Sequence, residues 1–538
     1  MFEHQPVVLT TSGPVRGFAP GGQAPLRFLG IPYAEPPTGP QRFMPPLPVA
    51  AWTDVREALA FGPAAAQVYD PHEAGLADFG VQAPADGAQP LWVGDEDCLS
   101  LNVWTSGLAG PPRSVLVWIH GGANWLESSR LACYDGAALA QRGDCVVVSF
   151  NYRLGLFGFL DLSGVGEAYA GSHSNGLRDQ LLALRWIRAN IERFGGDPAC
   201  ITLAGESAGS MNISWLAATG ELQGLVRRVV LMSGVASVIG FGHDHHESGH
   251  SQAEGRRRAH DFLAELDLDM ASLQRLPTAD LLARHAAYAR RCNVLFDLDT
   301  LFYPRVDGRF TRMTPFEAAQ QGLFDGLEVM LGFTAYEMGL WLQWDPSLDR
   351  GNTATMAARL LNFPPDCRAP LAAFYDHLHA DEPAGVRAMH LLADACFVMP
   401  AALLAETLVA RGGRVWMYQF DWSPGDPRRR ALHAADQGFF FGTLDSDGAR
   451  LVIGAPRDAA DAAERDRLSL AMQEALLAFV RTGEPQRAGL ARWPRYDAAR
   501  RVMHLDAPDC HVTLDPLRPR RRWWQENVFA PATGALLG

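Results

Sequence analysis

The stretch Ile201-Thr-Leu-Ala-Gly-Glu-Ser-Ala-Gly209 carries the strongest fold signal in this chain. Residues 201–204 form a short apolar run, which is typical of a strand buried on both faces. A helical pattern follows from Met211 to Leu216. Between them, the G-x-S-x-G pattern predicts a sharp turn that holds Ser207 at strained backbone angles, with glycines required sterically on both sides. Such a turn exposes the Ser207 hydroxyl above the edge of a sheet, where it can act as a nucleophile.

The rest of the chain continues this alternation of strands and helices. Ser114–Ile119 and Cys145–Phe150 are apolar, strand-length runs, and residues 176–194 carry apolar side chains at helical spacing. A second helical pattern runs from Glu464 to Arg481, and the basic, aromatic tail Arg518–Trp524 predicts a terminal helix packed on the body. Strand–helix–strand alternation predicts an α/β fold with a large, mostly parallel twisted sheet flanked by helices.

Composition excludes several classes of function. The 538 residues include 47 basic ones, all arginine, so chemistry that needs a Schiff-base, pyridoxal-phosphate or phosphate-loop lysine is impossible. A net charge of −13 opposes binding to nucleic acid or to an anionic membrane surface. The eight cysteines are scattered without metal-ligand spacing, which favours reduced, buried thiols.

Localisation is predicted from what the chain lacks. Its start, Met-Phe-Glu-His-Gln-Pro, has neither the basic residues nor the apolar run of a secretory signal, so we expect a cytoplasmic protein. The most apolar runs, such as Val146–Phe150, are the length of a strand. We therefore expect no window of about 20 residues that resembles a membrane span.

A second motif follows the strand that ends at Ile119. His120-Gly-Gly-Ala123 matches a loop whose backbone amides stabilise the negative charge of a tetrahedral intermediate, and glycines allow that backbone to approach closely. We expect the oxyanion donors to be the N–H groups of Gly122, Ala123 and Ala208.

A general base and an acid that orients it must complete such a site. In this kind of fold they follow the serine in the order acid, then histidine. Spacing alone does not choose among the histidines that lie beyond residue 337. These are His377, His379, His390, His433, His504 and His511.

Four longer motifs resemble those of type-B carboxylesterases, the cholinesterase-like family. They are Phe28-Leu-Gly-Ile-Pro-Tyr-Ala-Glu-Pro-Pro-Thr-Gly-Pro-Gln-Arg-Phe43, Glu96-Asp-Cys-Leu-Ser-Leu-Asn-Val-Trp104, Asn151-Tyr-Arg-Leu-Gly155 and Asn175-Gly-Leu-Arg-Asp-Gln180. The resemblance runs from about residue 7 to about residue 525 and is greatest to bacterial para-nitrobenzyl esterases. It implies an α/β-hydrolase fold in one domain over residues 1–538, with helical elements from about 235 to 430 that cap the active site.

The same resemblance selects the catalytic residues. Gly332–Glu337 is similar to the family segment that holds the acid, and Ala431–Asp436 is similar to the segment that holds the base. The implied triad is therefore Ser207, Glu337 and His433. His433 would take the Ser207 proton, and Glu337 would fix the imidazole tautomer while an acyl-enzyme forms and is hydrolysed.

The resemblance also implies supporting residues around the triad. Ser233 would place a hydroxyl near the acid, and Asp436 would lie behind the base. Two ion pairs would brace the site from beneath: Arg42–Glu96 and Arg153–Asp179.

Five positions are expected to line the substrate pocket: Asn124, Trp125, Glu206, Leu298 and Thr300. Asn124 stands where the family usually has an aromatic residue, and its amide could hydrogen-bond the substrate. Leu298 and Thr300 are not bulky aromatics, so acyl groups larger than acetyl should fit. We therefore expect hydrolysis of aryl or short-to-medium acyl esters, with only a small-molecule ester as partner.

Alternatives follow from particular features. Asn124 leaves open an amidase or carbamate hydrolase with the same triad, and the family includes neuroligin-like members that bind without catalysis. The run His243-Asp-His-His-Glu-Ser-Gly-His250 could bind Zn²⁺ or Ni²⁺, but the predicted chemistry is complete without a metal, so no metal or cofactor is expected. Nothing in the sequence predicts the oligomeric state.

Overall fold

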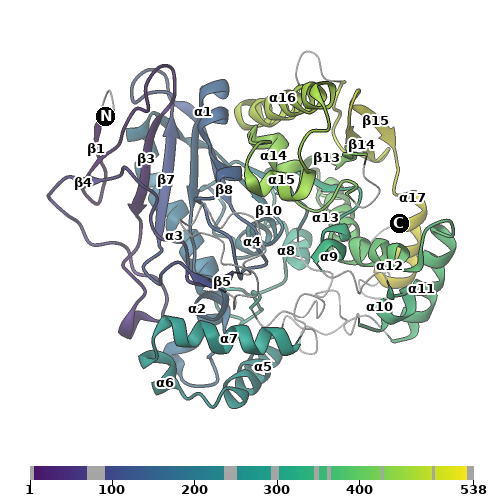
Figure 1. The fold of residues 1–538 in the computed structure, drawn as a ribbon, viewed down its shortest axis with the longest axis horizontal. Helices are drawn as coiled ribbons and strands as arrows, with labels where there is room; N and C mark the ends of the chain where they lie inside the picture. Colours follow the sequence, from purple (N-terminus) through teal and green to yellow (C-terminus); the bar gives the residue numbers. More distant parts are fainter. Residues whose placement is uncertain are drawn as a thin grey trace.

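The computed structural model of this chain describes residues 5–69, 91–235, 251–292, 302–344, 350–359, 365–425, 429–486 and 491–529. Within these ranges, a 10-stranded sheet forms the centre of the molecule (Figure 1). Its order from one edge to the other is β15-β14-β13-β12-β11-β10-β8-β9-β7-β3. The strands are β3 (Leu26–Pro32), β7 (Ser100–Thr105), β8 (Arg113–Ile119), β9 (Val146–Phe150), β10 (Gly196–Glu206), β11 (Arg228–Met232), β12 (Glu328–Thr334), β13 (Arg414–Phe420), β14 (Arg501–Leu505) and β15 (His511–Leu514).

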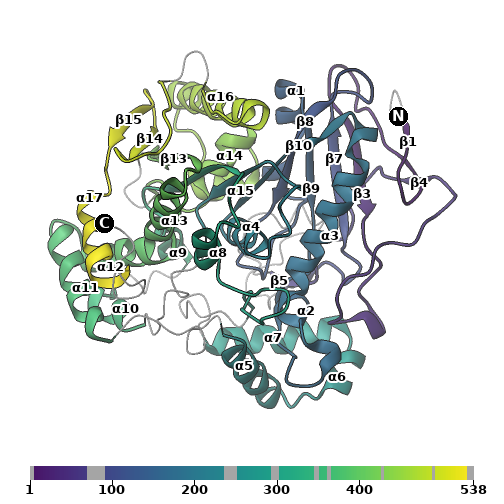
Figure 2. The same cartoon turned by 180° about the vertical axis from the view of Figure 1, so that it is seen from behind.

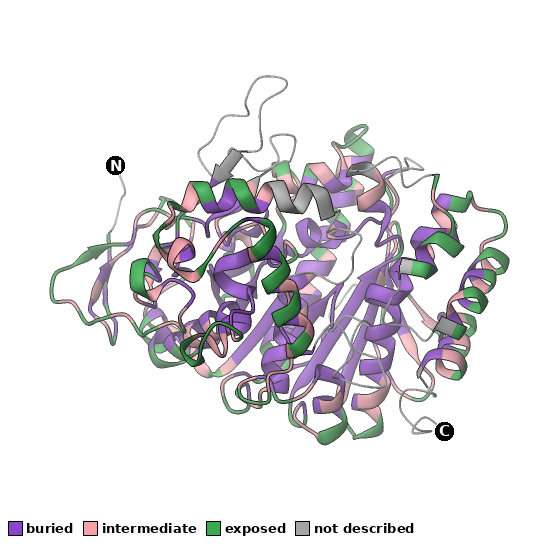
Figure 3. Ribbon diagram, turned by 90° about the horizontal axis from the view of Figure 1, so that it is seen from below, coloured by how far each residue is buried: buried purple, intermediate pink, exposed green. Residues whose placement is uncertain are grey.

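Neighbouring strands from β9 to β14 are parallel, and the antiparallel pairs lie at the two edges. The inner strands are buried along most of their length (Figure 3), as expected for a sheet covered on both faces. The predicted mostly parallel sheet is therefore confirmed. A 3-stranded sheet and a 2-stranded sheet also lie in the described residues: β1 (Val7–Leu9), β2 (Pro14–Arg16) and β4 (Arg56–Glu57), then β5 (Gln67–Tyr69) and β6 (Leu91–Val93).

Two groups of helices cover the faces of the sheet (Figures 1 and 2). The helices of each group pack on one another, and both groups reach β10. One group comprises α1 (Ala137–Gly143), α14 (Ala435–Phe441), α15 (Asp447–Ile453) and α16 (Ala459–Thr482). The other comprises α3 (Asn175–Asn190), α4 (Ala208–Ala218), α8 (Pro315–Gln321) and α13 (Met399–Ala410).

The predicted helices are found, and α4 and α16 extend beyond the patterns Met211–Leu216 and Glu464–Arg481. α16 begins five residues before Glu464 because the Asp458 side chain caps it by accepting a hydrogen bond from the Asp461 amide at 2.8 Å. The terminal helix α17 (Arg518–Trp524) packs on the body, since Trp524 is fully buried and its Nε1 donates to Tyr375 Oη at 3.0 Å.

The remaining helices lie in two clusters beyond the main body of the sheet (Figure 1). The first cluster packs near the short helix α2 (Gly155–Phe159), and the second lies on the side of α17. The first contains α5 (Gln252–Glu265), α6 (Met270–Arg275) and α7 (Thr278–Cys292). The second contains α9 (Gly339–Trp344), α10 (Thr353–Arg359), α11 (Pro365–Leu378) and α12 (Ala384–Ala393).

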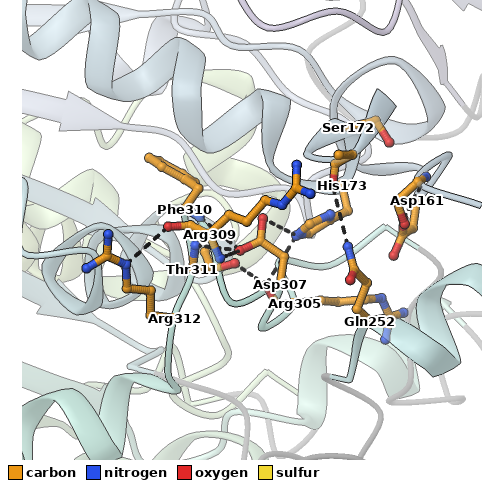
Figure 4. A network of polar contacts seen from close by, with 12 residues as sticks. Asp161, Ser172, His173, Gln252, Arg305, Asp307, Arg309, Phe310, Thr311 and Arg312 are labelled. Carbon is orange, nitrogen blue, oxygen red and sulfur yellow. Dashed lines mark hydrogen bonds and ion pairs between the residues drawn. The ribbon is translucent and has the colours of Figure 1, made fainter. Parts of the chain in front are cut away.

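A buried polar network ties the chain that follows the first cluster to the start of α3 (Figure 4). His173 Nε2 lies 3.2 Å from the Arg305 carbonyl oxygen and 3.7 Å from Asp307 Oδ2. Asp307 Oδ1 accepts hydrogen bonds from the amides of residues 309–311 at 2.8–3.0 Å. Burial lowers the pKa of His173, so its imidazole serves here as a neutral donor.

One expectation about membrane spans was wrong. The continuous helical stretch Ala384–Ala410 is long and apolar enough to cross a membrane by composition. However, 94% of its most apolar window is buried inside the protein, so it is a core element. Asp394 interrupts the apolar residues of this stretch, so no single uninterrupted apolar run marks it in the sequence.

Both ion pairs implied by the resemblance are confirmed. Arg42 contacts both Glu96 oxygens, at 2.5 and 2.8 Å, and Arg153 contacts both Asp179 oxygens, at 2.7 and 2.8 Å. All four side chains are buried, and bidentate geometry is the arrangement that best compensates the loss of hydration. The cysteines described are free: Cys98, Cys133, Cys145, Cys200, Cys367, Cys396 and Cys510.

Candidate active site

Ser207 lies at the turn between β10 and α4. Its backbone angles are φ 51° and ψ −124°, and its amide donates to the Met232 carbonyl oxygen at 2.9 Å. A Cβ on Gly209 would lie 2.2 Å from the carbonyl oxygen of Ile119, so no larger residue fits there. The predicted strained turn, with glycines required sterically, is confirmed.

The register of the sheet brings further segments to this turn. Gly205 pairs with Ile119 in β8, and Glu206 pairs with Met232 in β11. Parallel strands in register end at the same edge of the sheet, so the residues that follow them, His120, Ser207 and Ser233, leave the sheet side by side.

The loop after β8 lies against Ser207. A Cβ on Gly121 would lie 3.3 Å from Ser207 Cβ, which shows how closely the two backbones approach. Gly122, Ala123 and Asn124 have φ values of 80°, 53° and 61°, three consecutive left-handed residues. Such a run turns successive amides toward one side, as an anion-binding loop requires. The proposed donors Gly122 and Ala123 therefore lie on a loop of suitable shape, and Ala208 opens α4 directly after Ser207.

Glu337 and His433 are in direct contact. His433 Nδ1 lies 2.5 Å from Glu337 Oε2, and the other carboxylate oxygen, Oε1, accepts a hydrogen bond from the Thr334 amide at 2.8 Å. Glu337 is fully buried and His433 nearly so. The imidazole also packs against two aromatic rings, with centroids 5.2 Å from that of Trp341 and 4.7 Å from that of Phe397. These contacts hold the ring in one orientation.

The second imidazole nitrogen faces Glu206. His433 Nε2 lies 3.1 Å from Glu206 Oε1, and neither atom has an aligned hydrogen-bond partner in the described part of the chain. Burial of the imidazole lowers the pKa of His433, but the carboxylates of Glu206 and Glu337 outweigh this and raise it to about 9. Ser207 directly follows Glu206, and its hydroxyl is not hydrogen-bonded to His433 Nε2 in this structure, since that nitrogen has no hydrogen-bond partner among the described residues. Catalytic hydrogen bonds often align only when substrate binds.

Two residues were expected to support the triad, Asp436 and Ser233. Asp436 is fully buried and its Oδ2 accepts from Tyr418 Oη at 2.7 Å. Burial raises the pKa of Asp436 to about 6. Ser233 is buried with φ 47°, and its amide donates to the Gly332 carbonyl oxygen at 2.9 Å. Its hydroxyl has no hydrogen-bond partner among the described residues.

The residues expected to line the pocket have different surroundings in the structure. Asn124 is fully buried, and its Oδ1 accepts a hydrogen bond from Asn212 of α4 at 2.8 Å. Only its Nδ2 lacks a partner among the described residues, so the side chain chiefly ties the loop to α4. Trp125 packs 5.1 Å from His285 and 5.6 Å from Phe302, measured between ring centroids. Leu298 and Thr300 lie outside the described residues.

One residue whose carboxyl interacts with the base, Glu127, was not predicted from the sequence. Glu127 lies in the loop after β8, and its Oε2 accepts a hydrogen bond from Tyr134 Oη at 2.7 Å. Burial raises the pKa of Glu127 to about 7, and the charge of His433 is among the interactions that oppose this shift. The only sequence signal was the position of Glu127, four residues after Ala123, where a loop carboxylate is ordinarily solvated.

In the ranges that the structure describes, no group of three or more His, Cys, Asp or Glu side chains is arranged to hold a metal ion. The run His243–His250, considered as a metal site from sequence, lies outside those ranges.

Known proteins with similar sequences identify the family. A model of the carboxylesterase family matches residues 4–524. Para-nitrobenzyl esterase of Bacillus subtilis (strain 168) is 33% identical over 527 residues, which cover 96% of this chain and 98% of that protein. Phenmedipham hydrolase of Pseudarthrobacter oxydans is 32% identical over 501 residues, which cover 92% and 93%.

Solved structures are similarly close. A carboxylesterase of Geobacillus stearothermophilus has a TM-score of 0.80 at 32% identity, covering 96% of this chain and 99% of that one. A structure of a para-nitrobenzyl esterase has a TM-score of 0.79 at 32% identity, covering 96% and 98%. The chain therefore belongs to the carboxylesterase family, has the α/β-hydrolase fold and is a carboxylic ester hydrolase.

Proposed function

We propose that this enzyme hydrolyses carboxylic esters through a triad of Ser207, His433 and Glu337 and a covalent acyl-enzyme. The observation that carries the proposal is the 2.5 Å contact between Glu337 Oε2 and His433 Nδ1, formed at the sheet edge where Ser207 has a strained, left-handed backbone. A nucleophile, an oriented imidazole and a loop of left-handed residues at one point are the parts that acyl transfer requires.

The first step forms the acyl-enzyme. Ser207 Oγ attacks the ester carbonyl carbon while its proton passes to His433 Nε2. The carbonyl oxygen gains negative charge, and the N–H groups of Gly122, Ala123 and Ala208 stabilise it. His433 then gives the proton to the departing alkoxide oxygen, so the carbon–oxygen bond breaks and the alcohol leaves.

The second step repeats this sequence with water. His433 Nε2 takes a proton from water as the hydroxide attacks the acyl carbon, and it returns that proton to Ser207 Oγ as the acid leaves. Throughout, Glu337 accepts from Nδ1 and stabilises the imidazolium. The Thr334 amide and the burial of Glu337 fix the position of its carboxylate.

Ester hydrolysis is favoured over amide or carbamate hydrolysis. The amidase alternative depended on Asn124, but that side chain is fully buried and its Oδ1 accepts a hydrogen bond from Asn212 of α4. The remaining Nδ2 can only donate, so it cannot accept the N–H of a departing amine. An alkoxide needs one proton to leave, and His433 supplies it.

We further propose aryl or short-to-medium acyl esters as substrates. Trp125, half-buried beside Phe302 and His285, would form an apolar wall for such groups. One relative is named a para-nitrobenzyl esterase, which is consistent with aromatic esters. One domain over residues 1–538, with a cap from about 235 to 430, and a cytoplasmic location complete the proposal.

The test compares matched chromogenic substrates. Para-nitrophenyl acetate, butyrate and octanoate should give rapid turnover with a burst of nitrophenol, whereas para-nitroacetanilide and a para-nitrophenyl carbamate should turn over slowly. Ser207→Ala should abolish the burst, and Ser214→Ala, further along α4, should keep it. A Ser207→Ala enzyme with the burst intact, or an anilide rate equal to the ester rate, would refute the proposal.

A further inference from the structure

Glu127 occupies a backbone position that costs energy for any residue except glycine. Its φ is 77°, in the left-handed region, which is strained for a residue with a side chain. Its carbonyl oxygen is held by Gln67 Nε2 at 2.9 Å. The chain therefore turns at Glu127, and the backbone conformation there sets the direction of the side chain.

The Glu127 side chain folds back over the glycines of the same loop. A Cβ on Gly122 would lie 3.0 Å from Glu127 Cγ, and Tyr134 Oη donates to Glu127 Oε2 at 2.7 Å. Glu127 and Ser207 are both only half-buried, whereas Glu206, between Ser207 and the base, is almost fully buried. The Glu127 side chain therefore lies beside the oxyanion glycines, and Tyr134 holds its carboxyl there.

Several neighbouring groups affect the ionisation of the Glu127 carboxyl. Tyr134 and the backbone of Gly121 form hydrogen bonds with its carboxyl. In the described part of the chain, His433 is the only cationic group that lowers the pKa of Glu127. His120, behind Gly121, stays neutral because burial lowers its pKa to about 3. Tyr134 stays a neutral donor because burial raises its pKa well above the ordinary value.

The neighbouring Glu206–His433 pair does not compensate a charge on Glu127. Burial raises the pKa of Glu206 well above its ordinary value, and its Oε1 lies 3.1 Å from His433 Nε2. Whichever atom holds the proton between them, the pair has no net charge. Because burial raises the pKa of Glu127 to about 7, ionisation of Glu127 adds a negative charge to this side of the site near neutral pH.

We propose that Glu127 is a specificity-determining residue that selects the leaving alcohol by charge. The inference rests on the proposed function, in which His433 protonates the leaving alcohol, because groups that face His433 then border that alcohol. When ionised, Glu127 favours esters whose alcohol carries a cation and disfavours those with an anion. When protonated, it does not discriminate between them.

The test uses three acetate esters that differ only in a permanent charge. They are 3-(trimethylammonio)phenyl acetate, its neutral isostere 3-tert-butylphenyl acetate, and 3-sulfonatophenyl acetate. The quantity measured is the ratio of kcat/KM for each charged ester to that for the neutral one, from pH 6 to pH 8.5. Loss of activity from disturbed packing or from protonation of His433 affects all three esters alike and cancels in the ratio.

In the unaltered enzyme the cationic-to-neutral ratio should rise by about tenfold across this range, and the anionic-to-neutral ratio should fall. In Glu127→Gln both ratios should be independent of pH. Asp436→Asn is the matched control, since Asp436 is also a buried carboxyl with a raised pKa but is bonded to Tyr418 behind the base. Its ratios should still change with pH.

Any other outcome contradicts the inference. Ratios that do not change with pH in the unaltered enzyme would overturn it and leave the proposed function intact, since the esters would still be hydrolysed through Ser207. Ratios that change equally in Glu127→Gln would assign the effect to another group. If none of the three esters is hydrolysed, or if Ser207→Ala hydrolyses them equally fast, the proposed function itself fails.

Discussion

His433 Nδ1 lies 2.5 Å from Glu337 Oε2, and this contact joins positions 96 residues apart. Glu337 follows β12, whereas His433 precedes α14, so the contact forms only when the sheet and its helices are assembled. It occupies Nδ1 and leaves Nε2 beside Glu206, the residue before Ser207. An imidazole held in this way can take a proton on one nitrogen while a carboxylate stabilises the charge through the other.

Replacement of His433 should remove nearly all activity, whereas replacement of His504 should not. His504 makes a similar set of contacts, 2.5 Å from Asp421 Oδ2 and 2.7 Å from Thr513 Oγ1, but it lies on β14 near the sheet edge. We expect His433→Ala to lower kcat by about 10⁴–10⁶-fold. Steady-state kinetics with para-nitrophenyl acetate, with circular dichroism to verify folding, checks this. Equal losses in His433→Ala and His504→Ala would contradict the assignment.

The pH profile should show an unusually basic ionisation. Burial lowers the pKa of His433, but the charges of Glu206 and Glu337 outweigh burial and raise the pKa to about 9. The base acts when this proton is absent, so kcat/KM for a neutral ester should increase as the pH rises from 6.5 toward about 9. Glu337→Gln removes one of the charges that retain the proton, so its profile should rise at lower pH while kcat falls. A profile already flat at pH 6.5 in the unaltered enzyme would disagree with this account.

The raised pKa of His433 also predicts how the stability of the fold changes with pH. The folded-state pKa of His433 lies above the ordinary value of 6.5. Its carboxylate contacts therefore stabilise the fold fully below pH 6.5, and this contribution is lost as the pH rises through about 9.

Gly122 should be required for the oxyanion loop. A Cβ there would lie 2.2 Å from the Leu126 carbonyl oxygen, at a φ of 80°, so Gly122→Ala must displace the backbone amides. Loss of one oxyanion donor lowers kcat by about 10²–10³-fold. Gly22→Ala is a matched control, since Gly22 has a φ of 62° with no atom within 4 Å of an added Cβ. The control should keep its kcat, and a similar loss in both variants would point to general backbone strain instead.

Much of the fold could be predicted because local patterns were strong. The apolar runs of β8 and β9 and the Ser207 turn needed only their own residues, and the helical spacing of α3 and α16 was clear. His433 could not be chosen by spacing, since His504 obeys the same order rule and also binds a carboxylate. Only the resemblance separated them, because the contact to Glu337 depends on tertiary structure.

The roles of Asn124 and Glu127 were beyond prediction for a similar reason. An amide next to the oxyanion glycines could face the substrate or the protein, and the position of Asn212 on α4 decides this. Glu127 is unusual only because Tyr134 and the returning loop enclose it. Burial, which determines the chemistry of both side chains, is a property of the assembled fold.

The buried Arg153–Asp179 pair should contribute to stability far more than an exposed pair. Asp179→Ala leaves a guanidinium in a fully buried position and should cost about 3–5 kcal/mol. The exposed pair Arg185–Glu221, at a similar distance of 2.7 Å, provides the control, and Glu221→Ala should cost about 0–1 kcal/mol. Urea unfolding followed by tryptophan fluorescence measures both. Equal costs would show that burial of the pair does not matter.

The most direct test of the account is to locate the residue that becomes covalently modified. The enzyme is treated with a fluorophosphonate, digested and sequenced by mass spectrometry, with Ser207→Ala treated in parallel. We predict one adduct, on Ser207, that forms in step with the loss of esterase activity and is absent from Ser207→Ala. An adduct on another residue that accompanies inactivation, or inactivation without modification of Ser207, would contradict the central claim.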